Sequence, residues 1–113
     1  LKALRSGLYK QTRGQLRDKT GFCCLGVACE VYNLQQRKNK KKQIQYNSKY
    51  FEYDGETARL PVRVQHWLGL TSNIGDYYGH LNSTSLATRN DNGASFNKIA
   101  DIVESNPKGL FVE

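Results

Sequence analysis

The chain of 113 residues is long enough for one domain with one hydrophobic core and too short for two. Its 17 lysines and arginines exceed its 10 acidic residues by seven, which favours anionic partners such as nucleotides, nucleic acid or acidic protein surfaces. No apolar run approaches the length of a membrane span, and the three cysteines lack disulfide-type spacing, so we expect a cytoplasmic protein without membrane contact.

The N-terminal third predicts a short helix, a structured loop and a buried helix. Residues 1–8 place three leucines at helical spacing, and Gly7 among them weakens the turn. Turn residues around a short extended piece predict a tight hairpin or structured loop over 11–21. Residues 23–34 are apolar at almost every position, which predicts a helix buried on most of its circumference at the centre of the fold.

A basic segment follows this helix. Residues 35–43 contain five basic side chains and no acidic or apolar one, so the segment can bury nothing. We expect residues 1–113 to form a single domain from which 35–43 projects as a solvated basic loop.

The middle of the chain predicts a hairpin and a helix. Alternating polar and aromatic residues around Asp54-Gly55, a strong two-residue turn, predict two short antiparallel strands. Pro61 suits a helix start, and the helix after it would place Val64, Trp67 and Leu68 on one face.

The last part of the chain predicts a long loop and one secure helix. Residues 71–93 are rich in Gly, Asn, Ser and Thr and are expected to be mainly loop. Ser95 can cap a helix with an apolar stripe that ends before Asn106-Pro107. The expected fold class is α+β, a small single domain with three to four helices around a buried central helix and one or two short antiparallel β-hairpins.

Several strings together carry a resemblance: ALRSGLYKQ, then LRD, then GFCCLGV, and later HWLGL and RNDNGASFNKIADIVE. They resemble a group of small uncharacterised proteins encoded by bacteriophages, including cyanophages, which share an ALRSGxYxQ, LRD, GxCCLGV order. The resemblance covers most of the chain outside the lysine-rich segment. It implies a viral origin and carries over no catalytic residue.

The adjacent cysteines allow a catalytic and a structural interpretation. Cys23 or Cys24 at a helix N-terminus could be a reactive thiolate with His66 or His80 as its base, as in a cysteine hydrolase. Free cysteine is also among the most buried residue types, and core packing is the favoured interpretation. A metal site is not expected, because no fourth ligand is suitably spaced near the cysteines.

Polar loops on both sides of the central helix supply the candidate binding residues. No phosphate-binding loop motif is present, but arginine forks and aromatic stacking can hold an anion without one. Groups before the buried helix could converge on a charged ligand, and groups in the later loop could close over it. Local ion pairing and core filling are the competing structural interpretations. The candidate residues are Lys10, Thr12, Arg13, Arg17, Tyr77, Tyr78 and His80.

These observations favour a non-enzymatic phage-type protein that needs no cofactor and sequesters an anionic, nucleotide-type ligand, for instance a signalling molecule of host antiviral defence. The alternative is an inhibitor that binds nucleic acid or an acidic host protein, in which the lysine run 38–42 and Arg63 steer the partner. A cysteine hydrolase comes third. The sequence leaves open a homo-oligomeric state.

Overall fold

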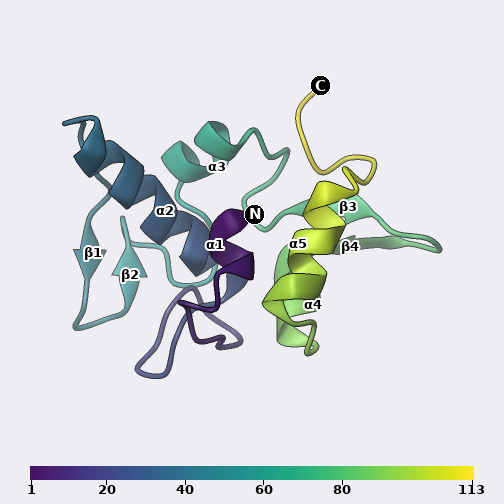
Figure 1. Ribbon diagram of the computed structural model, residues 1–113, viewed down its shortest axis with the longest axis horizontal. Helices are drawn as coiled ribbons and strands as arrows, with labels where there is room; N and C mark the ends of the chain where they lie inside the picture. The colour runs from purple at the N-terminus through teal and green to yellow at the C-terminus, as the bar shows by residue number, and fades with distance from the viewer.

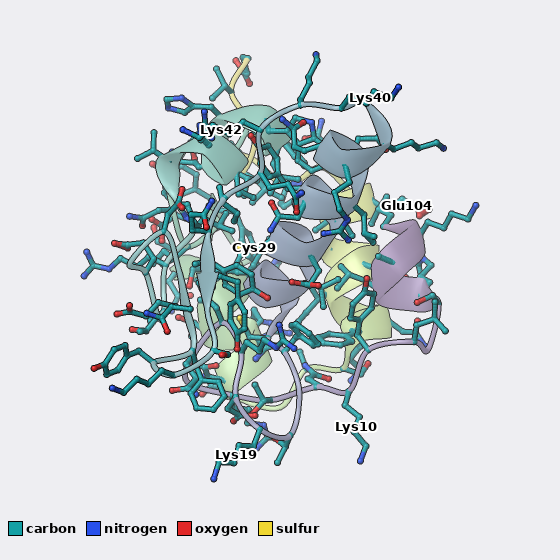
Figure 2. The ribbon with its side chains drawn as sticks, turned by 90° about the vertical axis from the view of Figure 1, so that its left-hand side faces the viewer. Lys10, Lys19, Cys29, Lys40, Lys42 and Glu104 are labelled. Atoms are coloured by element: carbon teal, nitrogen blue, oxygen red, sulfur yellow. The ribbon has the colours of Figure 1, made fainter.

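Helix α2 (Cys24–Lys38) lies at the centre of the fold in a computed structural model that describes residues 1–113 (Figure 1). The buried apolar side chains form one cluster of 17 residues, and α2 contributes a large share of them. Figure 2 shows Cys29, which is fully buried, in the middle of the molecule. The prediction that residues 23–34 form the buried centre is therefore confirmed.

Helix α2 is longer than predicted. It continues to Lys38, four residues into the segment expected to be loop. Glutamine, arginine and lysine are good helix formers, and a helix that is already nucleated gains one hydrogen bond with each added residue. The low apolarity of residues 35–38 therefore correctly indicated solvent exposure but not the end of the helix.

Three of the four shorter helices pack closely against α2. Helix α1 packs against α2 and α5, α3 packs against α2, and α4 packs against α2 and α5. As predicted, Ser95 caps α5, because its hydroxyl accepts a hydrogen bond from the Lys98 N–H. Helix α3 buries Val64 but leaves Trp67 43% exposed. The bounds of these helices are α1 Lys2–Arg5, α3 Val62–Leu68, α4 Leu86–Asp91 and α5 Phe96–Glu104.

The first hairpin is present, but its turn is not the predicted one. Strands β1 (Tyr46–Asn47) and β2 (Glu52–Tyr53) pair antiparallel. Both strands precede Asp54-Gly55, so this dipeptide does not connect them. That dipeptide does form a tight turn, in which Tyr53 and Glu56 exchange two backbone hydrogen bonds of 2.9 Å. The strand pairing does not continue beyond Glu56, because the carbonyl of the next residue, Thr57, accepts a hydrogen bond from the Leu16 N–H.

The second hairpin lies in the segment expected to be mainly loop. Strands β3 (Asp76–Tyr78) and β4 (Ser83–Ser85) pair antiparallel, and α4 follows directly. Strands of only three residues are too short to give a clear alternating pattern, which explains why the sequence did not indicate them. With two short hairpins and five helices, the predicted α+β class is confirmed. None of the helices has both the length and the apolarity needed to span a lipid bilayer.

Candidate functional site

The loop that precedes α2 is folded back onto the start of this helix. Thr12 N–H donates to the Phe22 carbonyl at 2.7 Å, and Phe22 N–H donates to the Lys10 carbonyl at 2.8 Å. The Leu16 carbonyl accepts from Cys23 N–H at 3.0 Å and lies directly against Gly26, where a Cβ atom would overlap it. The predicted structured loop is thus held by backbone hydrogen bonds and by a helical glycine.

A buried amide fixes this loop to α4. Asn90, fully buried, accepts hydrogen bonds at Oδ1 from Gln11 Nε2 (2.8 Å) and from Cys24 N–H (3.1 Å). Its Nδ2 donates to the Thr12 carbonyl at 2.8 Å. One side chain therefore satisfies the first backbone N–H of α2 and the backbone of the loop at the same time.

Thr12 and Arg17, two of the candidate binding residues, take part in internal contacts. Thr12 is buried, and its hydroxyl donates to Asp18 Oδ2 at 2.5 Å. The Arg17 guanidinium carbon lies 4.3 Å from the centre of the Tyr46 ring and 4.8 Å from that of Phe22. Its Nη1 is 3.9 Å from a carboxylate oxygen of Glu30, not of the adjacent Asp18.

The side chain of Arg17 is only 33% exposed. Cation–π contacts and partial burial are typical of a cation that stabilises the fold. The interpretation of Arg17-Asp18 as a local salt bridge is corrected, because Asp18 is occupied by hydroxyl and backbone donors of the loop.

Asp18 gives the fold an acid-sensitive contact. The hydrogen bond from Thr12, supported by that from Thr20, lowers the pKa of Asp18 from 3.8 to about 2. A lowered pKa means that the stabilisation is complete above about pH 4 and is lost as the pH falls toward 2. We expect Asp18→Asn to lower the free energy of unfolding by about 1 kcal/mol near neutral pH, since the carboxylate is partly solvated.

Urea unfolding of both proteins from about pH 6 down to about pH 2 measures this effect, and the two stabilities should converge at the acid end. A difference that persists unchanged at the acid end would show that the Asp18 charge does not contribute.

The other candidates of this loop, Lys10 and Arg13, are exposed. Neither forms an ion pair, since only Arg5 and Arg17 of the basic residues contact carboxylates. Figure 2 shows Lys10 at the lower end of the molecule, with its side chain directed into solvent. Of the four candidates before α2, these two leave their charge free for a partner.

The candidates of the second hairpin lie elsewhere. Tyr77 is buried in the core, whereas Tyr78 is 60% exposed and His80 is exposed. Figure 1 shows the β3–β4 hairpin at the right-hand edge, away from the purple loop before α2. The hairpin is held there by the C-terminal segment, since Tyr78 N–H donates to the Lys108 carbonyl at 2.8 Å. The structure therefore does not bring the two groups of candidates together, which corrects the expectation that the tyrosines close over the loop.

The cysteine pair is buried, as the core interpretation predicted. Cys23 precedes α2 and Cys24 is its first residue, and each is 5% exposed. Burial raises the pKa of both thiols, which favours the neutral form. Both candidate bases, His66 and His80, lie at the surface. The structure contains no cluster of three or more His, Cys, Asp or Glu side chains able to hold a metal ion.

The densest free charge lies where α2 ends, in what we call the basic end. All of its side chains are exposed, and none has a carboxylate partner within 4.0 Å. Figure 2 shows two of them, Lys40 and Lys42, at the top, opposite to Lys10 and Lys19 at the bottom. The basic end consists of Arg37, Lys38, Lys40, Lys41 and Lys42.

The basic end is held by polar contacts on both sides. The buried Asn33 amide accepts from Ile44 N–H at 2.9 Å and donates to the Ile44 carbonyl at 3.2 Å. Gln36 Nε2 donates to the Lys42 carbonyl at 3.0 Å. The predicted solvation of this segment agrees with its exposure, but the segment is a folded helix end followed by a clamped turn.

Fold and surface together define a small α+β protein with one concentrated cationic segment. A family model described as a domain of unknown function (DUF8296) matches residues 1–107, and the chain belongs to this family. No curated protein and no solved structure matches the chain.

Proposed function

We propose that the protein is a non-enzymatic binding protein for an anionic partner, and that it contacts the phosphate backbone of nucleic acid through the basic end. The observation that carries this proposal is the exposure of five cations without a carboxylate partner within six residues, 37–42. Each cation that neutralises a phosphate releases condensed counterions, which is the main source of sequence-independent affinity.

A polymer fits this surface better than a single nucleotide. A small ligand needs a concave site in which several groups converge. Here Lys10 and Arg13 project from one loop, and Tyr78 and His80 lie on a separate hairpin. A nucleic acid backbone requires only a row of accessible charges on a firm support, as the end of α2 provides.

The proposal of a non-enzymatic role is supported by the state of the thiols. A nucleophilic cysteine requires a lowered pKa and access to substrate. Cys23 and Cys24 have raised pKa values and are buried. The nucleotide-type ligand and the phage origin predicted from the sequence stay predictions, and the first is a distinct outcome of the experiment below.

Fluorescence anisotropy with short labelled oligonucleotides tests the proposal. If five phosphates are contacted, the affinity for single strands should fall about 100-fold between about 50 and about 200 mM salt. The triple variant Lys40→Gln, Lys41→Gln, Lys42→Gln should bind more weakly and reduce the slope of log affinity against log salt by about 2.

A matched control removes three positive charges elsewhere, with Arg89→Gln, Lys98→Gln and Lys108→Gln on α4, on α5 and after α5. This control should retain most of the affinity and the slope. Equal losses in both variants would show that only net charge matters, against a site at the basic end. Saturable binding of a mononucleotide that persists at high salt would instead favour the sequestration of a small ligand.

A further inference from the structure

The structure also contains an apolar cavity of about 270 Å³, whose lining contrasts chemically with the charged basic end. Fourteen of its 15 lining residues are hydrophobic, and they come from all five helices and the C-terminal segment. A soluble domain this small normally fills such a space with its own side chains. An opening of this size with almost no polar wall is suited to an apolar ligand.

The wall on α2 explains why space is left. Ala28 is a small residue between the larger Leu25 and Val31, all three of which line the cavity. Trp67 of α3 also lines the cavity and is 43% exposed. Its ring is held by an edge contact with Tyr32, with 5.3 Å between the ring centres. The indole thus forms a firm, half-exposed edge of the cavity.

Charge selects the type of ligand. Lys2 carries the only charged side chain of the lining, and it is exposed. Helix α5, which packs against α1, carries the carboxylates of Asp101 and Glu104. Arg5 already pairs with both, at 2.7 and 3.3 Å. The free ammonium at the cavity therefore complements an anionic head group.

We propose that this cavity binds a fatty acid, with the alkyl chain among the apolar residues and the carboxylate paired with Lys2. An apolar cavity of about 150 Å³ takes up benzene. The larger space here suits a saturated chain of about eight to twelve carbons. The wall offers no set of hydrogen-bonding groups for a polar tail, and Lys2 lies where the head group would remain in contact with water.

Trp67 is the only tryptophan and reports occupation directly. Titration with decanoate below its micelle concentration should give a saturable change in tryptophan fluorescence. Across shorter saturated acids, each added methylene should strengthen binding about fourfold until the cavity is full. Decanol, which has the same chain without the charge, should bind several-fold more weakly than decanoate.

Two variants separate the chain from the head group. Lys2→Gln should weaken decanoate and leave decanol unchanged, whereas Lys98→Gln, a surface control, should change neither. Ala28→Leu should reduce the binding of both ligands by filling the cavity, with circular dichroism to show that the helices are retained and calorimetry as a readout independent of Trp67.

The absence of saturable decanoate binding would overturn the proposal. So would decanoate binding that is insensitive to both Lys2→Gln and Ala28→Leu. Equal affinity for decanol and decanoate in the wild-type protein would overturn the assignment of an acid. Because the cavity and the basic end use different residues, these outcomes are independent of nucleic-acid binding.

Discussion

Gly26→Ala is expected to destabilise the protein by about 3 kcal/mol or more, although alanine is the better helix former by about 1 kcal/mol. The reason is the Leu16 carbonyl, which lies where the new Cβ would be placed. That carbonyl also accepts from the Cys23 N–H, so it cannot move without loss of a backbone hydrogen bond. Urea-induced unfolding followed by circular dichroism measures the change in the free energy of unfolding.

The matched control is Ala28→Gly in the same helix. It should cost about 1 kcal/mol from helix propensity, with a smaller loss from the methyl group that packs against the core. If Gly26→Ala is neutral or stabilising, the close approach of loop and helix is not a feature of the folded protein.

Asn90→Ala is expected to cost about 3 to 5 kcal/mol. The truncation leaves the Cys24 N–H and the Thr12 carbonyl without their partner in a buried place, and it leaves the Gln11 amide with the Ala94 carbonyl as its remaining acceptor. Each buried polar group left unsatisfied costs about 1 to 3 kcal/mol. Thermal and urea unfolding should both show the loss.

Asn92→Ala serves as the control, because Asn92 lies two residues away, just after α4, and is exposed. Its substitution should change stability by less than about 0.5 kcal/mol. Similar effects of the two substitutions would contradict the role assigned to the buried amide.

Much of the helical core could be predicted, because its signals are local. The capping serine of α5 and the apolar run of α2 are both present in contiguous sequence, and both helices form as expected. The second hairpin was missed because its short strands carry no periodic signal. Its position depends instead on pairing with the backbone after α5, which sequence distance hides.

The candidate site was only partly predictable, for the same reason. Arg17 stands next to Asp18 in sequence, but the fold brings it to Glu30 and to two aromatic rings. Asn90 lies in a polar segment that reads as loop, yet it is fully buried and has the central structural role. The solvent exposure of the charged residues 37–42 could be predicted directly, since a segment without apolar residues must lie in solvent.

The paired amide of Asn33 has a consequence for how the surface can vary. Its two hydrogen bonds to Ile44 join the chain on both sides of the basic end, so residues 34–43 form a segment that is closed at its base. The entropy of closing such a segment changes slowly with its length. Related chains can therefore have a longer or shorter segment here, or one with different charges, while the core keeps its packing. Partner preference can then diverge within a constant scaffold.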